Sequence, residues 1–177
     1  MKKTCWGGIA VAVVLVSLAL PALGNGLLFE KQEYAARRAR LMEAIPDGAV
    51  ILLGAQPVVG YNPYFQNNDF MYFSGVEIPD AVLVIDGKRK QATLLFTMNE
   101  RAAKGEGLPV ELITNTREFT GIEQVAPADQ LSSVLSRLAG QGYILYTSFK
   151  PEELMREVSS EKLGALQRYT TFNLWDG

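Results

Sequence analysis

The stretch AVLVIDGKRKQATLLF, from Ala81 to Phe96, decides the fold class of this 177-residue sequence. Two apolar runs flank the short polar segment Asp86–Lys90, which begins with Asp-Gly. Strands joined by so short a connection pair antiparallel, so the stretch predicts a β-hairpin. A sheet built around a central hairpin cannot be wholly parallel.

Segments on both sides of the hairpin alternate between helix and strand patterns. Spacing of apolar residues predicts helices over Glu30–Ala44 and Pro127–Leu138. Continuous apolar runs at 49–54 (AVILLG) and 143–147 (YILYT) are typical of strands buried on both faces. The segment VELIT, which begins at Val110, predicts a weaker strand. A charged helix is predicted to begin at Pro151. This order favours an α/β fold, in which helices flank a mixed β-sheet.

Composition limits the size and the partners of the protein. With 48% hydrophobic and 20% charged residues, the chain can bury one ordinary core, which indicates a single folded domain. Seventeen Lys and Arg oppose nineteen Asp and Glu, a net charge of -2. No dense basic face is predicted, so nucleic acid is excluded as a partner.

The N-terminal segment has the pattern of a secretory signal. Lys2 and Lys3 precede the uncharged run GGIAVAVVLVSLAL, and Pro21 comes before small residues. We expect residues 1–24 to be removed after Gly24 and the protein to be exported, to the periplasm or outside the cell. An uncleaved anchor is the alternative, although the run is shorter than the about 20 residues that span a bilayer. The single cysteine, Cys5, would leave with the signal.

The sequence lacks several kinds of catalytic group. It contains no histidine, which excludes Ser-His and Cys-His nucleophiles and histidine metal ligation. Asp80 and Asp86 bracket a strand, and turn chemistry is favoured over a metal site there. Glu152, Glu153 and Glu157 indicate a solvated helix face, and Gly105–Gly107 indicates a loop.

The stretch FQNNDFMYFSG, from Phe65 to Gly75, combines amides with an aromatic cluster. Gln66–Asp69 is typical of a turn, since short amide side chains bond the local backbone. Phe70–Phe73 then predicts a strand with Phe70 and Tyr72 on one face and Met71 and Phe73 on the other.

The longer segment PYFQNNDFMYFSGVEIPDAVLVID resembles the signature of the aminopeptidase P N-terminal domain, which precedes the catalytic domain in Xaa-Pro aminopeptidases and in creatinase/prolidase proteins. The matching positions are Gln66, Asn68, Asp69, Phe70, Tyr72, Phe73, Ser74, Gly75, Pro79, Asp80, Ala81, Val82 and Leu83. Flanking matches at 37–55 and 120–135 extend the resemblance over roughly Glu33 to Tyr146. The sequence departs from the family pattern at Phe65, where Arg is common, at QPVVGYNP and at AKGEG.

The resemblance implies an RNase H-like α/β domain that carries no catalytic residue and no metal ligand of its own. In the family, a separate C-terminal pita-bread domain binds two divalent metals, usually manganese, through two Asp, one His and two Glu, and removes the residue before proline. We expect that domain as a partner in cis or in trans, with proline-containing peptides reached through it, and self-association as a homo-oligomer. Gln66, Asn68, Asp69 and Tyr72 are the predicted substrate or partner surface, while Phe70 and Phe73 are predicted in the core.

The expected organisation is a signal peptide at 1–24, the family domain at 25–150, and a helical tail at 151–177 that starts a linker to a missing catalytic domain. The end at TTFNLWDG, with its apolar residues, suggests a fragment or half of a split protein. The alternative is a free-standing extracytoplasmic binding module that kept the fold without the enzyme. A chain that is itself an active hydrolase is the least favoured hypothesis.

Overall fold

Five strands form one mixed sheet in the order β4-β3-β2-β1-β5. The computed structural model describes residues 27–57, 63–147 and 158–169. The strands are β1 (Gly48–Leu53), β2 (Val82–Asp86), β3 (Gln91–Leu95), β4 (Gln124–Ala126) and β5 (Ile144–Thr147). Neighbours β1, β2 and β3 pair antiparallel, whereas β5 joins β1 and β4 joins β3 in parallel. The α/β fold with a mixed sheet flanked by helices is confirmed.

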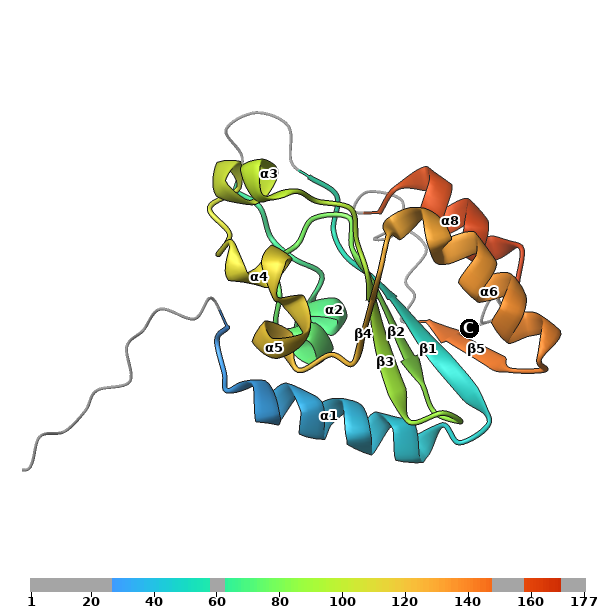
Figure 1. Cartoon of the computed structure of the whole chain (residues 1–177). Coiled ribbons are helices and arrows are strands. Elements are labelled where there is room, and N and C mark those ends of the chain that lie inside the picture. The colour runs from blue at the N-terminus through green and yellow to red at the C-terminus, as the bar shows by residue number, and fades with distance from the viewer. Residues whose placement is uncertain (1–26, 58–62, 148–157, 170–177) are drawn as a thin grey trace, which may run out of the picture.

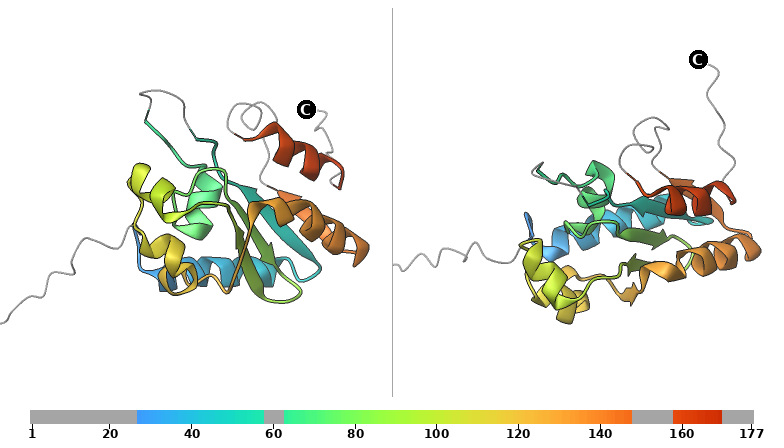
Figure 2. Two further views of the ribbon diagram at one scale, coloured as in Figure 1. Left: turned by 45° about the horizontal axis from the view of Figure 1, so that its top comes forward. Right: turned by 90° about the horizontal axis from the view of Figure 1, so that it is seen from above.

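Helices cover both faces of this sheet (Figure 1, Figure 2). They are α1 (Lys31–Ala44), α2 (Asn68–Ser74), α3 (Glu100–Gly105), α4 (Glu111–Thr114), α5 (Thr116–Thr120), a 3-10 turn at Ala128–Gln130, α6 (Leu131–Gly140) and α8 (Ser160–Gln167). Within the described ranges no helix has the length and apolar character needed to cross a bilayer.

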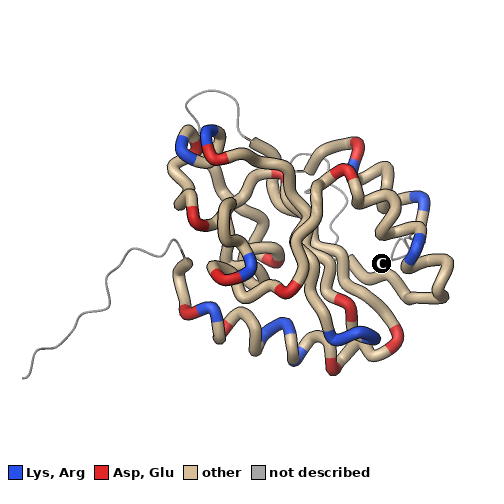
Figure 3. The backbone as a smooth tube through the Cα atoms, viewed as in Figure 1, with Lys and Arg blue, Asp and Glu red and all other residues tan. Residues whose placement is uncertain are grey.

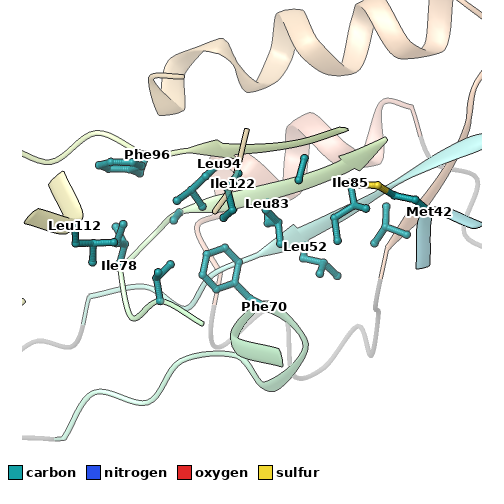
Figure 4. Close-up of a cluster of buried hydrophobic side chains, with 14 of the residues drawn as sticks. Met42, Leu52, Phe70, Ile78, Leu83, Ile85, Leu94, Phe96, Leu112 and Ile122 are labelled. Carbon is teal, nitrogen blue, oxygen red and sulfur yellow. The ribbon is translucent and has the colours of Figure 1, made fainter. Parts of the chain in front are cut away.

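Alternation along the strands divides the core into two clusters. On β1, Val50 and Leu52 face the first cluster, together with Met42 of α1, Phe70 of α2 and Leu112 of α4 (Figure 4). Ala49, Ile51 and Leu53 face the opposite way, where α6 and α8 supply Leu131, Leu135, Leu138, Ala165 and Leu166. All of β1 is buried, which confirms the prediction that AVILLG is a strand covered on both faces.

The β2–β3 hairpin also agrees with prediction. Asp86 pairs with Gln91 across the turn, and the Asp86 carboxylate accepts the backbone N–H of Arg89 at 2.8 Å. Glycine is required at position 87, because a Cβ there would lie 1.9 Å from the Ile45 carbonyl oxygen. The turn therefore fixes both the register of the hairpin and the end of α1 against it.

Three sequence predictions of local structure are wrong. Phe70–Phe73 and Val110–Thr114 were predicted as strands, but α2 and α4 occupy them. Four or five apolar and aromatic residues fit one turn of helix as well as a short strand, and tertiary packing decides between them. The run at 143–147 is a strand, but β5 lies at the sheet edge with Ile144 and Tyr146 exposed, so it is not buried on both faces.

Other predicted elements differ only in extent. The helix predicted over Pro127–Leu138 is the 3-10 turn followed by α6. Gly105 ends α3, and Gly107 follows with a φ of 72°, so the predicted loop is partly helical. The predicted signal peptide and the helix predicted from Pro151 through Glu157 lie outside the described residues. Val158 and α8 pack in the second cluster.

Candidate interaction surface

Helix α2 carries most of the residues predicted to form a surface. Its C-terminus is closed by Gly75, which adopts a left-handed conformation with a φ of 74° and returns its N–H to the carbonyl of Met71. Phe70 points into the first cluster (Figure 4). It is 0% exposed, whereas Tyr72 is 49% exposed. The helical rotation of about 100° per residue, rather than strand alternation, separates the two rings. Phe70 and Tyr72 therefore do not share a face as predicted.

Gln66 supports the base of α2 with its side-chain amide. Its Oε1 accepts the backbone N–H of Ala55 at 2.7 Å and that of Asn67 at 2.9 Å, while Nε2 donates to the Ile78 carbonyl at 3.1 Å. Asn67 adds a bond from Nδ2 to the Leu53 carbonyl at 2.9 Å. These bonds join the end of β1 to the loops on both sides of α2. The polar atoms of Gln66 thus bind backbone and are not presented to a ligand.

Asn68 and Asp69 begin α2 with exposed side chains. A carboxylate in the first turn interacts favourably with the partial positive charge of the helix N-terminus. Asp69 and Tyr72 are three residues apart, so they are neighbours on the helix surface. Of the four predicted surface residues, the structure places Asn68, Asp69 and Tyr72 on the exposed side of α2 and turns Gln66 inward.

Arg37 of α1 lies among three aromatic rings. Its guanidinium carbon is 4.3 Å from the Tyr72 ring centroid, 4.9 Å from that of Phe29 and 5.1 Å from that of Tyr34. Nε donates to Glu33 at 3.0 Å, and Nη1 donates to the Tyr72 carbonyl at 3.1 Å. We call Phe29, Tyr34, Arg37 and Tyr72 the aromatic–arginine cluster.

The aromatic–arginine cluster is not among the sites that the sequence patterns predict. Its local signal was present, because Glu33 and Arg37 are spaced i,i+4 and Tyr34 and Arg37 i,i+3 on a predicted helix. The contact with Tyr72 depends on how α1 packs against α2, which no local pattern specifies. Cation–π contacts hold long side chains in place at a partly exposed site.

Arg38, the next residue, is buried beneath this surface. It is 1% exposed, and its guanidinium donates to the carbonyls of Phe73 and Gly121, each at 2.9 Å. These carbonyls lie at the C-terminal ends of α2 and α5, where a cation is favoured by the helix dipole. Burial lowers the pKa of Arg38, and the charge of Glu123 opposes that shift. Arg38 therefore ties α1 to α2 and α5.

A cavity of about 370 Å³ adjoins Arg38, between α1 and the residues Lys90 and Glu123. Lys90 and Glu43 lie on its lining together with small and apolar residues of α1. The Glu123 carboxylate accepts the backbone N–H of Ala92 at 2.9 Å, and Lys90 donates to the Met42 carbonyl. The charged groups of the lining thus balance in number, and Arg38, Lys90 and Glu123 already make hydrogen bonds within the protein.

Asp80 and Asp86 have structural partners. Asp80, in a left-handed conformation with a φ of 56°, forms an ion pair with Lys162 of α8 at 2.6 Å. Asp86 closes the hairpin and accepts a hydrogen bond from the Tyr143 hydroxyl at 3.2 Å. Burial, followed by the charge of Asp86, raises the pKa of Tyr143. The turn interpretation of both aspartates agrees with these contacts.

The residues of this chain do not fit the metal-ligand set that the family resemblance implies for a separate catalytic domain. In the described part of the structure, no group of three or more His, Cys, Asp or Glu could hold a metal ion. The whole sequence contains no histidine, so a ligand set of two Asp, one His and two Glu cannot be assembled from it.

Comparison with known proteins agrees with the fold and with the signature segment. The family described as "Aminopeptidase P, N-terminal domain" matches residues 34–146. The Xaa-Pro aminopeptidase of Escherichia coli (strain K12) is 42% identical over 60 residues, which is 31% of this chain and 14% of that protein.

Solved structures give the same result. Aminopeptidase P from E. coli with the inhibitor Pro-Leu superposes with a TM-score of 0.62 at 21% identity, covering 78% of this chain and 32% of the other. Icp55 from Saccharomyces cerevisiae gives 0.56 at 22% identity, covering 72% and 33%. At these identities the structures show a shared fold. The chain spans about a third or less of the length of each of these relatives.

Proposed function

The chain belongs to the aminopeptidase P N-terminal domain family, and we propose that it is the non-catalytic domain of an Xaa-Pro aminopeptidase-like metallopeptidase, one that shapes substrate access and assembly beside a separate catalytic domain. The observation that carries the proposal is the aromatic–arginine cluster. Within it Phe29 and Tyr72 are exposed, whereas Tyr34 is buried and the Arg37 side chain is only 11% exposed. The cluster thus presents two ordered aromatic rings next to the family signature, and it is not a set of acid, base and nucleophile. The catalytic domain is the partner, in cis or in trans.

The composition of the aromatic–arginine cluster suits a protein interface. Tyr and Arg are enriched among the residues that dominate binding energy at protein interfaces. Arg37 is held by three rings and Glu33, so little side-chain freedom remains to be lost on binding. Phe29 and Tyr72 present apolar edges around it, and Asp69 adds a charge beside Tyr72.

The chemistry of the proposed parent enzyme belongs to the catalytic domain. Two divalent metals there, manganese in our proposal, would activate the water that attacks the peptide bond before proline. The residues of this chain position helix α2. Hydrogen bonds of Gln66 and Asn67 anchor the segment at its start, and a hydrogen bond from Arg38 anchors its C-terminal end. That support fixes the direction in which Asp69 and Tyr72 face the entrance for proline-containing peptides.

Binding in trans tests the proposal. The catalytic domain of an Xaa-Pro aminopeptidase from the same organism, produced separately, should bind the mature protein, and Tyr72→Ala and Asp69→Ala should each weaken binding about tenfold or more by calorimetry. Tyr169→Ala is the matched control, because Tyr169 is also a partly exposed tyrosine but lies beyond α8. Both α2 variants should keep the melting temperature within a few degrees of wild type.

A catalytic domain that does not bind this chain would refute the proposal. If the folded chain instead binds a different extracytoplasmic ligand, the free-standing module explains the fold better. Metal-dependent release of the first residue from an Xaa-Pro peptide by this chain alone would contradict both.

Export is part of the proposal. The basic start, the apolar run and the small residues before Asn25 support a cleaved signal. Mass spectrometry of the protein recovered from the periplasm or the medium should show a chain that begins at Asn25. A full-length chain in the membrane fraction would instead support the uncleaved anchor.

A further inference from the structure

Lys162 of α8 is a buried lysine that is paired with Asp80. Charged positions of the described chain lie mainly on the helices and in the turns, and few lie on the strands (Figure 3). Lys162 is 8% exposed, and its Nζ lies 2.6 Å from Oδ2 of Asp80 and also donates to the main-chain carbonyl of that residue. A buried ammonium group is costly unless it is paired and hydrogen-bonded. Asp80 thus provides two acceptors that hold Lys162 in the interior.

Asp80 in turn adopts a conformation that needs support. Its φ of 56° lies in the left-handed region, which aspartate tolerates better than most residues but which still costs free energy. Its Oδ1 is buried and has no hydrogen-bond partner in the described part of the structure. The Lys162 ammonium balances the charge of this carboxylate. Without Lys162, a carboxylate with one buried, unpaired oxygen would remain at a left-handed position.

The backbone of Asp80 belongs to the hydrogen bonds that support α2. Its N–H donates to the Ala55 carbonyl at 2.7 Å, and the Ala55 N–H donates to Oε1 of Gln66 at 2.7 Å. The same Oε1 accepts the N–H of Asn67, the residue before α2, at 2.9 Å. A continuous series of contacts therefore leads from α8 through Asp80, Ala55 and Gln66 to the start of α2.

The apolar side of α8 packs elsewhere, on the face of the sheet opposite to α2. Val158, Ala165 and Leu166 lie in the second core cluster, beside α6 (Figure 1), whereas α2 contributes Phe70 to the first cluster. A helix of eight residues is too short to be stable by itself in water, so α8 depends on its contacts with the domain. Lys162 links this dependent helix to the loop that joins α2 to β2.

We propose that Lys162 is a positioning residue for α2: the docking of α8 holds Asp80, and through Asp80 and Gln66 the start of α2, in the observed conformation. The segment that matches the family ends at residue 146, so this support comes from outside it. Coupling between two sites is reciprocal, so a partner bound to Asn68, Asp69 and Tyr72 should also hold α8 more tightly. Only this last consequence rests on the proposed function.

Amide hydrogen exchange of the mature chain, followed by NMR, tests the coupling. In Lys162→Met, which keeps the apolar stem of the side chain, exchange at Asp80, Ala55 and Asn67 should become at least about tenfold faster. Leu94, in β3 between β2 and β4, reports opening of the whole domain and should change less. Arg168→Met is the matched control, because it removes a positive charge at the exposed end of α8 and should leave the exchange at Asn67 within about twofold of wild type.

Asp80→Asn tests the same pair from the other side. Asparagine tolerates the left-handed conformation but removes the charge that faces Lys162. Exchange at Asn67 should again accelerate, and the double variant Asp80→Asn/Lys162→Met should be no faster than the faster single variant, because both changes break one pair. If Lys162→Met does not fold, the exchange in Asp80→Asn decides the outcome by the same comparison of Asn67 with Leu94.

Equal acceleration at Asn67 and Leu94 would mean that α8 only stabilises the domain as a whole, which overturns the proposal. Acceleration at Asp80 with unchanged exchange at Asn67 overturns it as well, because the series of contacts would then end before α2. Additive effects of the two substitutions would show that they do not act through one pair, with the same consequence. No catalytic domain is present in these measurements, so their outcome does not depend on the proposed function.

Discussion

Arg37 and Arg38 are consecutive residues on α1, but they belong to opposite sides of the α1–α2 pair. Arg38 is buried and binds the ends of two helices through their carbonyls. Arg37 is stacked among aromatic rings at a surface. Arg38 thus fixes the position of α2 relative to α1. Because α2 is fixed, Arg37 can contact both the ring and the carbonyl of Tyr72. A step of one residue along α1, a rotation of about 100°, therefore separates the buried structural role of Arg38 from the recognition role proposed for the side of Arg37.

The largest effect should come from Phe70→Ala on the buried side of α2. Phe70 is completely buried in the first cluster, so its removal should lower the free energy of unfolding by about 3–5 kcal/mol. Tyr72→Ala, on the exposed side of the same helix, should cost about 1 kcal/mol or less. Urea denaturation measures both, and equal losses would show that the two sides are not distinct.

Arg38→Met should have the next largest effect. Methionine keeps much of the volume but leaves the Phe73 and Gly121 carbonyls without their donor, at a cost of about 2–4 kcal/mol. Arg37→Met loses cation–π contacts and a partly exposed ion pair, worth about 1 kcal/mol. An Arg38→Met protein as stable as wild type would mean that the buried cation is replaceable by apolar packing.

Gly75→Ala tests the residue that closes the C-terminus of α2, where the helix packs against Tyr34 of α1. A Cβ at Gly75 would lie 2.6 Å from the Tyr34 ring, and the φ of 74° disfavours any side chain. We expect a loss of about 1–3 kcal/mol. Gly105→Ala is the control, because it also sits at a helix end but has open space around it. Equal melting temperatures for the two variants would contradict the contact with Tyr34.

The smallest effect concerns Lys31, on the first turn of α1. Its hydrogen bond to Glu118 at 2.6 Å, with the lysine charge, lowers the pKa of Glu118 from its ordinary value of 4.5. A lowered folded-state pKa stabilises the fold above the unfolded value, and this contribution is lost as the pH falls through the folded value. NMR titration should show the pKa of Glu118 moving back toward 4.5 in Lys31→Met, and an unchanged titration would exclude the pair in solution.

Sequence patterns predicted β1, β2 and β3 of the sheet correctly, but they predicted the wrong secondary structure for Phe70–Phe73 of the signature segment. The hairpin and β1 were predicted because turn chemistry and continuous runs of branched apolar residues are local properties. The helix α2 was not, although Gly75 is a common helix terminator. Its seven residues are too few for periodicity to distinguish a helix from a strand, and the packing of Phe70 under α1 decides the outcome.

Of the candidate surface, the sequence indicated Asn68, Asp69 and Tyr72 through the family resemblance. It could not indicate that Gln66 is a structural support, since Ala55 and Ile78 reach it only in the folded chain. For the same reason, the position of β5 at an edge was not predictable. An apolar run has the same pattern whether one or two strands flank it.

The parallel pairing of Gly48 with Ile144 has a consequence for synthesis. During translation, β1 can pair with β2 as soon as the hairpin has emerged, but its other neighbour follows only after α6. Until then β1 exposes one row of backbone groups, which is a route to misassembly for nascent chains. Release of a chain that stops before Ile144 should therefore give an insoluble product, even though the β1–β2–β3 meander, the 3-10 turn and the first core cluster are all encoded in it.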